Sequence, residues 1–460
     1  MSDLQTETSQ EMDTDPTLDA HDVGQIRAAL ATGDDTRLAE FVEALHPADA
    51  ADLLEQVDET EREDLLARWP GQFDGEVLSE LNEGLREEVI DQLSPEELRD
   101  AVRDLETDDV VDLVEDLDEP RQEAILEALD APERLAIEQS LTYPEDSAGR
   151  LMQRAAVAAP EHWSVGEVID YMRARDDLPQ QFYHVFLVDP RMKPMGYVTL
   201  GRVLSSTRDT ALRDITEDSF RLLSLDTPDD EVAYIFNQYH LISLPVIDSA
   251  GRLAGVITID DAMVVLDQEH EEDMMRLAGV GEEEISDRVG GILKARLPWL
   301  FVNLLTAIAA SLVIAQFDDA ISAVVALAVL MPIVASMGGN AGTQSLTVAV
   351  RALATRDLTA SNMARVVRRE AAVGLLNGLF FAVVMGALAL FWFGSTTLAW
   401  TIAVAMVVNL LVAALAGILV PVVLDRAQLD PALASGTFVT TVTDVVGFAA
   451  FLGLATLVLL

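Results

Sequence analysis

Three patterns of hydrophobic and polar residues follow one another along the chain: short amphipathic segments, alternating segments and long apolar segments. From residue 293 onward, five apolar stretches are long enough to cross a lipid bilayer as helices. They lie at about 297–316, 320–350, 371–393, 398–424 and 433–459. We therefore expect a multidomain integral membrane protein, with soluble domains before a five-helix transmembrane domain at 293–460.

The region 21–141 repeats one kind of helix start. "LHPADAADLLEQV", from Leu45, and "LSPEELRDAV", from Leu93, both place Pro and then acids at the beginning of an apolar-periodic run. Pro at the first helical position and acids near the positive end of the helix dipole favour such starts. The pattern predicts an acidic all-α superhelix of helical hairpins. A disordered tail is expected before it, at 1–20, where apolar residues are almost absent.

The region 142–266 contains an internal repeat with the period of strands. "FYHVFLVD" and "PMGYVTL" in the first copy correspond to "LISLPVID" and "RLAGVITIDDAM" in the second, and each copy predicts strand, turn, strand and helix start. The repeat resembles a tandem pair of α/β CBS (cystathionine-β-synthase-type) modules, at about 142–205 and 213–266. Such pairs often bind adenine nucleotides. The resemblance implies one ATP site, at Thr258 and Asp261, because Gly201 and Arg202 replace the acidic end of that turn in the first copy. A purely structural pair is the alternative.

A connecting ("plug") helix is expected at 267–292, directly before the membrane domain. Glu269, Glu272 and Asp273 share one face of this helix. Three carboxylates on one face repel one another unless cations, salt or solvent relieve them, and oxygen ligands suit Mg²⁺ or Ca²⁺. The helix is therefore placed to link ion binding to the membrane domain, although an acidic face in so acidic a chain could also have no role.

The formal net charge of −48 is confined to the soluble part of the chain. From Gly291 onward, 8 Lys and Arg stand against 7 Asp and Glu. An acidic excess argues against nucleic acid as a partner, because cationic side chains supply that affinity. The excess is compatible with a salt-adapted surface, with divalent-cation binding or with disorder. The helical spacing of apolar residues argues against disorder. The small number of Lys residues favours a halophilic cytoplasm. The absence of Cys excludes disulfides, and the polar N-terminus is not a signal peptide.

The last apolar stretch contains one ionisable residue, Asp444, about midway along it. A lone carboxylate in a membrane span costs at least a few kcal/mol, so it usually faces water or a partner rather than lipid. Small or hydroxylated residues surround it, among them Thr440 and Thr441. We therefore predict that Asp444 lies in a cation path.

The second apolar stretch is too long for a plain crossing and contains Pro332 and a glycine-rich run. We expect a break at its centre, because non-helical backbone at membrane depth is tolerated where it lines a cavity. The residues expected to line that cavity are Gly339, Asn340, Gly342 and Gln344. Close helix packing is the alternative for the glycines, but it does not explain the two amides. The third and fourth spans, the latter with Asn409, are interpreted as scaffold.

The loop between the second and third spans is basic, whereas the loops after the first and third spans have no basic residue. It contains Arg351, Arg356, Arg365, Arg368 and Arg369. Because basic residues concentrate in cytoplasmic loops, we expect a cytoplasmic N-terminus and an extracellular C-terminus.

The order of these parts is similar to that of the MgtE family of magnesium channels. The specific matches are "MGGNAGTQS" with "VRALATRDL", and "LDPALASGTFVTTVTDVVGF" leading into the last span. The resemblance implies a homodimer with one pore on the two-fold axis, lined by spans two and five. Two copies of Asp444 would hold a hydrated Mg²⁺ there, and Asp430 matches an acid at the inner mouth of the pore.

The resemblance also implies regulation by intracellular Mg²⁺ through acids of the soluble part. The matching residues are Asp261, Glu269, Glu272 and Asp273. His240 and Val264 stand where acids are expected, which weakens or moves one regulatory site.

Three classes of function compete for this chain, the third being a non-transporting sensor or a membrane enzyme. The first is a Mg²⁺-selective channel of the cell membrane that mediates uptake and is gated by intracellular Mg²⁺, with ATP as a candidate second regulator. The alternative is a cation-coupled secondary transporter for other divalent metals such as Co²⁺ or Mn²⁺. An enzyme is not expected, because the sequence shows no P-loop, no Ser/His/Asp set and no metal-ligating His pair.

Overall fold

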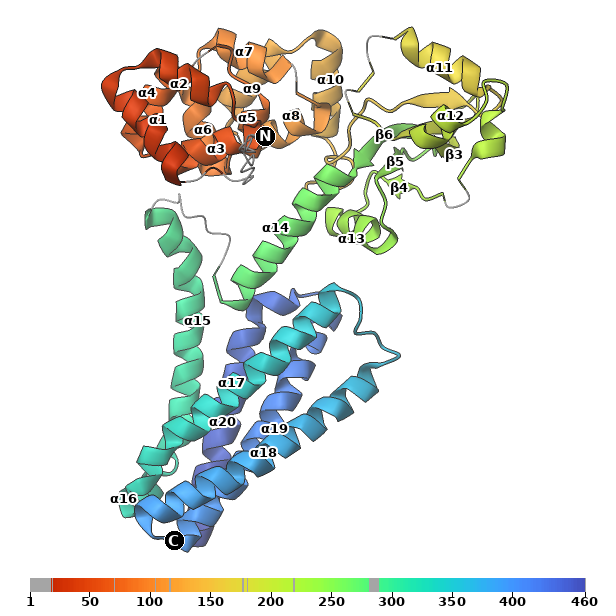
Figure 1. Ribbon diagram of the computed structural model, residues 1–460. Coiled ribbons are helices and arrows are strands. Elements are labelled where there is room, and N and C mark those ends of the chain that lie inside the picture. The colour runs from red at the N-terminus through yellow and green to blue at the C-terminus, as the bar shows by residue number, and fades with distance from the viewer. Residues whose placement is uncertain are drawn as a thin grey trace, which may run out of the picture. The chain divides into compact units, whose positions relative to one another are not determined.

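The computed structural model of the chain describes residues 18, 20–69, 71–103, 105–115, 117–175, 178–179, 181–217, 220–280 and 289–459 (Figure 1). Nearly all of the expected disordered tail and residues 281–288 of the expected connecting helix lie outside the described residues. The chain divides between Leu266 and Asp267 into two compact units. Each unit is described by itself.

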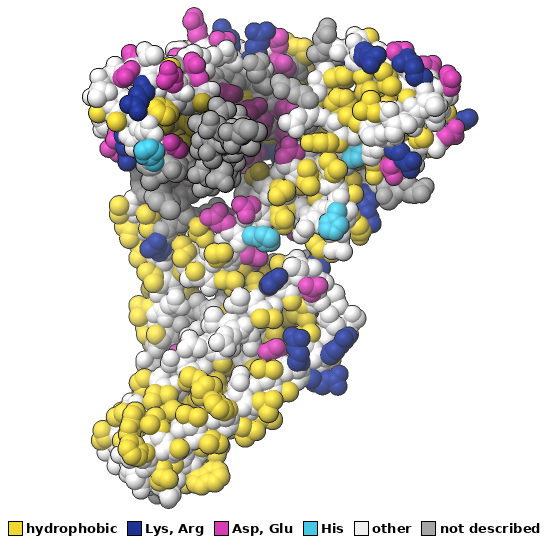
Figure 2. Space-filling model, viewed as in Figure 1, with side chains coloured by type: hydrophobic (Ala, Val, Ile, Leu, Met, Phe, Trp, Pro, Cys, Tyr) yellow, Lys and Arg dark blue, Asp and Glu magenta, His cyan; other side chains and the backbone are white. Residues whose placement is uncertain are grey.

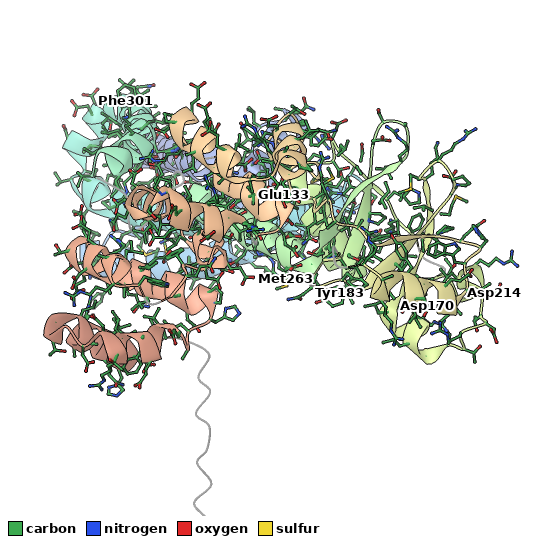
Figure 3. The ribbon with its side chains drawn as sticks, turned by 90° about the horizontal axis from the view of Figure 1, so that it is seen from above. Glu133, Asp170, Tyr183, Asp214, Met263 and Phe301 are labelled. Carbon is green, nitrogen blue, oxygen red and sulfur yellow. The ribbon has the colours of Figure 1, made fainter. Side chains whose placement is uncertain are left out.

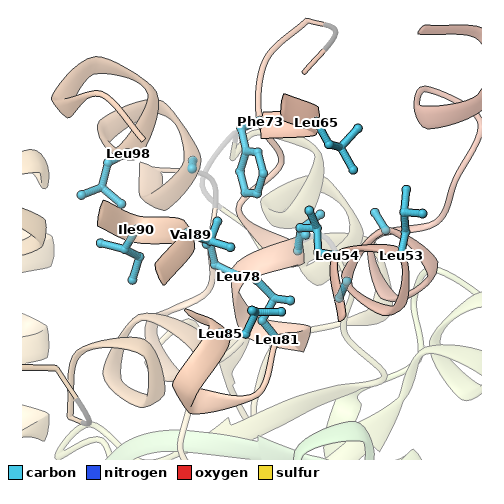
Figure 4. Close-up of a cluster of buried hydrophobic side chains, with 14 of the residues drawn as sticks. Leu53, Leu54, Leu65, Phe73, Leu78, Leu81, Leu85, Val89, Ile90 and Leu98 are labelled. Carbon is cyan, nitrogen blue, oxygen red and sulfur yellow. The ribbon is translucent and has the colours of Figure 1, made fainter. Parts of the chain in front are cut away.

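The first unit opens with a series of short helices. They are α1 (Ala20–Thr32), α2 (Asp35–Val42), α3 (Pro47–Gln56), α4 (Glu59–Ala67), α5 (Glu76–Glu80), α6 (Glu83–Gln92), α7 (Pro95–Arg103), α8 (Thr107–Glu115), α9 (Glu119–Ala128) and α10 (Ala131–Ser140). The start signals explain their bounds: Pro47 begins α3, and Ser94 forms a capping box with Glu97 at α7. Leucines from successive helices, such as Leu54, Leu65 and Leu78, form one continuous buried core (Figure 4).

The rest of the first unit contains two three-stranded sheets. The strands are β1 (Ala158–Pro160), β2 (His184–Val188), β3 (Pro194–Thr199), β4 (Leu223–Ser224), β5 (Ser243–Ile247) and β6 (Leu253–Thr258), and the helices are α11 (Val165–Arg173), α12 (Leu200–Ser205), the 3₁₀ helix η1 (Leu212–Ile215) and α13 (Asp229–Tyr239). In each sheet the hairpin is antiparallel, and β1 or β4 runs parallel to its first strand. Both hairpins were predicted, but β1 and β4 were missed, because three and two residues are too few to show an alternation.

The two hairpins are joined where their first strands begin. The imidazole Nδ1 of His184, at the start of β2, is hydrogen-bonded to the hydroxyl of Ser243, at the start of β5. The ring also meets Tyr197 edge-on, with centroids 4.5 Å apart. Burial lowers the pKa of His184 to about 4, so the ring is neutral at pH 7.

Helix α14 (Ile259–Leu277) starts at the end of the second hairpin and continues past the division between the units. It ends earlier than the predicted connecting helix, 267–292. Gly279 adopts the left-handed conformation (φ +73°), and the Val280 N–H donates to the Met275 carbonyl (3.0 Å). This is a common way to end a helix, because it satisfies carbonyls of the last turn.

The second unit continues with the membrane helices. They are α15 (Val289–Ala315), α16 (Asp318–Ala323), α17 (Ala326–Ala354), α18 (Met363–Phe393), α19 (Thr396–Arg426) and α20 (Pro431–Leu459). All except α16 are long and apolar enough to span a membrane, which makes five candidate spans among the described residues. Figure 2 shows the hydrophobic side chains that cover much of these helices. The predicted architecture is confirmed in its helical domain, its two α/β repeats and its five membrane helices, and the dimeric pore stays a prediction.

The predicted break in the second span is wrong. Helix α17 is continuous through Pro332 and the glycine-rich run, and the excess length of the apolar stretch belongs to the separate helix α16. A Cβ on Gly338 would lie 2.3 Å from the Asn409 amide nitrogen, and one on Gly342 would lie 2.6 Å from Val439. These two glycines allow close helix packing within a continuous helix.

Candidate ion pathway and regulatory acids

Asp444 is held by α20, the last membrane helix. Its side chain is half-buried and has no hydrogen-bond or ion-pair partner among the described residues. Nearby hydroxyls donate to carbonyls of the same helix: Thr440 donates to the Gly436 carbonyl (2.9 Å), and Thr441 donates to the Thr437 carbonyl (2.6 Å). Because the described residues supply no counter-charge, a charged Asp444 needs water or a cation from outside.

The residues predicted to line a cavity in the second span lie on different sides of α17. Asn340 and Gln344 are exposed and four residues apart, so they share one open face of the helix. Gly342 faces the opposite way, toward Val439 of α20. Two polar features of these helices are open to a second copy of the chain. One is the face of α17 with the two amides, and the other is the half-buried Asp444 of α20.

Asn409 has a larger part in this region than its interpretation as scaffold suggested. It is fully buried in α19, and its side-chain amide donates to the Val334 carbonyl of α17 (2.7 Å). Cβ atoms on Gly338 of α17 or Gly447 of α20 would lie within 3.0 Å of this amide group. Asn409 thus lies between α17 and α20, and only the three-dimensional arrangement identifies the two glycines as its neighbours.

The end of α14 and the start of α20 are joined by an ion pair that the sequence analysis missed. Arg276 of α14 contacts Asp430 through Nη1 (3.1 Å) and Glu272 through Nη2 (2.5 Å). Asp430 also accepts the Ala432 N–H (2.7 Å), which caps α20. Asp273 lies nearby: burial and then repulsion by Asp430 raise the pKa of its carboxyl, and Arg276 opposes the rise. The predicted residues Glu272, Asp273 and Asp430 are therefore gathered around one arginine.

An apolar contact accompanies this ion pair. Leu277, the last residue of α14, packs against a cluster that includes Leu346 of α17 and Ala432 and Val439 of α20. Because α14 ends on the two helices that carry Asn340 and Asp444, a shift of α14 would reach both of them. Glu269 lies on α14, two turns before its end, and its side chain is half-buried.

A second group of acids lies in the first unit, where α8 approaches the start of α14. Asp108 is 7% exposed, and neither carboxylate oxygen has a hydrogen-bond partner in the described chain. Burial, followed by repulsion from Asp261, Asp109 and Glu106, raises the pKa of Asp108 well above its usual range. Burial is also the main cause that raises the pKa of Asp109 to about 6 and that of Asp261 to about 7. We call these four residues the α8–α14 acid cluster.

Within the α8–α14 acid cluster, only Asp261 was predicted as a site residue. The Thr258 hydroxyl donates to its carboxylate (2.7 Å), so the Thr-x-x-Asp turn is formed as the sequence suggested. Glu106, Asp108 and Asp109 were missed, because each resembles an ordinary acid in or next to the first turn of a helix. No group of three or more Asp, Glu or His side chains among the described residues is close enough together to hold a metal ion. The unpartnered oxygens of Asp108 nevertheless suit a cation, which would relieve the repulsion.

The first CBS copy lacks this arrangement. Thr199 accepts the Arg202 N–H at the start of α12 (3.2 Å), and no acid takes the place that Asp261 has in the second copy. His240 caps α13 in the left-handed conformation (φ 52°), and Val264 is exposed on α14. Neither offers a carboxylate.

Comparison with known families assigns each part of the chain. Residues 331–454 match the MgtE model, described as a divalent cation transporter, residues 45–146 match the MgtE intracellular N domain, and residues 148–208 and 212–267 match CBS domains. The magnesium transporter MgtE of Thermus thermophilus is 34% identical over 318 residues, which cover 68% of this chain and 70% of that protein. The magnesium transporter MgtE of Bacillus subtilis is 28% identical over 314 residues, which cover 68% and 69%.

A solved structure extends this likeness to the soluble part. The crystal structure of the cytosolic domain of the Mg²⁺ channel MgtE in complex with ATP has a TM-score of 0.50 and 29% sequence identity, and covers 53% of this chain and 99% of that chain. Family models thus match all three parts that were predicted from the sequence. The chain belongs to the MgtE family of magnesium transporters.

Proposed function

We propose that this chain is a Mg²⁺-selective channel of the cell membrane that mediates magnesium uptake. The observation that carries the proposal is Asp444: a half-buried carboxylate without a partner among the described residues, midway along a span of a magnesium transporter. A charge kept there without a counter-charge needs a function that involves a cation. Mg²⁺ dehydrates reluctantly and is usually held through its waters, so a carboxylate that leaves room for a hydration shell suits it.

The channel works as a homodimer whose pore lies on the two-fold axis. The open face of α17 with Asn340 and Gln344 supports this proposal, because amides on a membrane helix are best placed toward water or a second copy. The soluble part offers a surface for the same dimer: Tyr183 and Met263 are 42% and 61% exposed (Figure 3). Two copies of Asp444 then face one another across the pore, with Asp430 at its inner mouth. Gly339, Thr440 and Thr441 line the wall in this proposal, whereas Gly342 packs against Val439 of its own chain and is left out of the wall.

The membrane orientation follows from the basic loop between α17 and α18. That loop, the N-terminal unit and Asp430 are on the cytoplasmic side in this proposal, and the C-terminus is outside. Single cysteines test this assignment well, because the chain has none of its own. A cysteine at Ser395, between α18 and α19, should react with an impermeant maleimide added to intact cells, and one at Thr359 should not.

The test of the pore is Mg²⁺ flux into proteoliposomes that contain the full-length chain. Asp444→Asn should abolish flux while the protein remains dimeric. Asp425→Asn is the matched control, because Asp425 is an exposed acid near the end of α19, outside the pore. Normal flux through the Asp444→Asn protein would contradict the proposal.

A cation-coupled secondary transporter is the second candidate, since a lone carboxylate in a span also suits a coupling proton. The same proteoliposomes distinguish the two functions. Flux through a channel follows the Mg²⁺ gradient and the membrane potential alone. Flux through a coupled carrier, for example of Co²⁺ or Mn²⁺, stops when the proton and sodium gradients are collapsed.

Intracellular Mg²⁺ closes the channel in our proposal, through the α8–α14 acid cluster and through Glu269, Glu272 and Asp273 of α14. The buried Asp108, whose carboxylate oxygens have no partner in the described chain, supports this role, because a divalent cation removes the repulsion between it and its acidic neighbours. Asp108→Asn should leave the channel open at internal Mg²⁺ concentrations that close the parent protein, as measured by single-channel recording. Unchanged inhibition would show that the cluster does not regulate the channel, and it would leave the pore assignment intact.

ATP is proposed as a second regulatory ligand, held by Thr258 and Asp261. A relative's cytosolic domain was crystallised with ATP, and the Thr258–Asp261 turn is formed here. Isothermal titration of the full chain should show ATP binding that Asp261→Ala weakens and that Asp267→Ala, an exposed acid of the same helix, leaves unchanged. Equal heats for the two variants would contradict the site.

A further inference from the structure

We propose that a cleft between α17 and α18 binds the headgroup of an anionic phospholipid. The cleft has a volume of about 310 Å³ and lies where α17 ends and α18 begins, at the loop that joins them. Arg365, Arg369 and Asn362 line it from α18 and its cap, and Asp357 lines it from the loop. Figure 2 shows Lys and Arg side chains gathered at this end of the second unit, beside the hydrophobic side chains of the membrane helices.

Several arginines at this end of the membrane helices have no close acidic partner among the described residues, although Asp and Glu outnumber Lys and Arg by 78 to 30 in the chain. Within the described residues, Arg351, Arg365 and Arg368 form no ion pair, and Arg369 has one distant contact, 3.7 Å from the neighbouring Glu370. In the first unit, by contrast, Arg121 and Arg150 meet carboxylates at 2.6 Å. The cleft therefore presents the Arg365 guanidinium without an ion-pair partner in the described residues, and the Arg369 guanidinium with only the distant contact to Glu370.

The loop beside the cleft is fixed by several hydrogen bonds. The Asn362 side chain bridges the loop: its amide donates to the Asp357 carbonyl (2.6 Å), and its oxygen accepts the Thr359 N–H (2.9 Å). Leu358 is buried, and its N–H donates to the Ala352 carbonyl (2.7 Å). The Asp357 carboxylate accepts the Thr355 hydroxyl (2.9 Å). A preformed site loses little conformational freedom on binding.

The walls of the cleft indicate a lipid rather than a soluble anion. Val348 of α17, Val366 of α18 and Ile418 of α19 line it beside the arginines. One turn further into the span, the Ser345 hydroxyl donates to the Glu370 carboxylate (3.2 Å) and joins α17 to α18. A ligand that fits must carry a phosphate for the guanidinium groups and an apolar chain for these walls. Basic pockets between membrane helices bind anionic headgroups in this way, and arginine forks match phosphate oxygens.

The test measures binding of phosphatidylglycerol to the delipidated full-length protein in detergent, by native mass spectrometry. Charge-assisted hydrogen bonds contribute about 1.5–3 kcal/mol, so the Arg365→Gln/Arg369→Gln variant should lose affinity by about tenfold or more. Arg351→Gln is the matched control, because it removes a charge from the same end of α17 outside the cleft. We expect its affinity to stay within about twofold of the parent protein, since distant surface charges are screened.

Three results would overturn the proposal. Equal losses in the cleft variant and in Arg351→Gln would show non-specific attraction to the basic loop. Equal binding of phosphatidylcholine would show that the arginines do not select the headgroup. Displacement of the lipid by glycerol phosphate at equal concentration would identify a soluble phosphate as the ligand. Arg365→Lys/Arg369→Lys keeps the charge, so intermediate affinity in that variant separates loss of the site from misfolding.

Discussion

Two groups of acids in this protein differ in how their charge is balanced. Around Asp430, in the second unit, the chain supplies the cation itself: Arg276 lies 3.1 Å from Asp430 and 2.5 Å from Glu272. In the α8–α14 acid cluster, in the first unit, Asp108 is more deeply buried, yet its oxygens have no partner in the described chain. The neighbours of Asp108 are Asp261, Asp109 and Glu106, all of which repel it.

This difference shows which of the two groups of acids depends on ions from solution. An ion pair within the chain is present whether or not metal is present. A buried carboxylate among other carboxylates must take a proton or a cation from solution. The stability of the α8–α14 acid cluster is therefore expected to respond to Mg²⁺, whereas the Arg276–Asp430 contact is expected to be independent of it.

The largest expected effect is a reversal in the behaviour of Asp108→Asn. Without Mg²⁺, this variant should be more stable than the parent chain, by about 1 kcal/mol, because the amide is neutral and avoids the cost of burying, or of protonating, the Asp108 carboxyl among other acids. With Mg²⁺ at about 100 times its dissociation constant, the parent chain should gain about 2.7 kcal/mol, and the variant should gain much less. Thermal unfolding of the full chain, with and without Mg²⁺, measures both changes.

The control for this experiment is Glu119→Gln, which removes an exposed acid from α9. It should keep the full response to Mg²⁺. A parent chain that gains no stability from Mg²⁺ would show that the cluster is neutralised by protons alone.

A smaller effect is expected from His184, which is buried but has no like charge beside it. His184 is 8% exposed, and its pKa is lowered to about 4 by burial, which the more distant Glu217 partly opposes. Between pH 6.5 and 4 the unfolded chain binds a proton at this position that the folded chain does not, so stability falls as the pH falls through this window. We expect a loss of about 2 kcal/mol between pH 7 and pH 5 from this residue.

The measurement is the free energy of unfolding as a function of pH, compared with His184→Asn, which cannot take the proton. The difference between the two curves should grow toward acid pH. Parallel curves would show that the histidine is solvated and that its burial has no such effect.

The smallest expected effect concerns Arg276 and Asp430. Both side chains are 29% exposed, so a double-mutant cycle with Arg276→Met and Asp430→Asn should give a coupling energy of about 1 kcal/mol or less. The coupling should be the same with and without Mg²⁺. A coupling that disappears in Mg²⁺ would show that the ion competes for Asp430, and it would remove the contrast between the two groups of acids.

Local patterns predicted local structure well in this protein. The hairpins β2–β3 and β5–β6 are recognisable because each pairs two short apolar segments across a turn and the unit occurs twice, and the five spans follow from their length and hydropathy. The prediction of a broken second span was wrong because glycines that allow close packing and glycines that interrupt a helix look alike in a sequence. Only the position of Asn409 beside Gly338 distinguishes them.

The sequence alone determined where the chain enters the membrane, which region is repeated, and that Asp444 is the only acid in its span, because these properties depend on neighbours along the chain. The tertiary structure decided which acids lie together. Asp108 and Asp261 are far apart in sequence, and so are Arg276 and Asp430, and no local periodicity records such pairs. Each acid resembled an ordinary helix-start or surface acid until folding placed it beside another acid or beside an arginine, and this placement decides whether it needs a cation from solution.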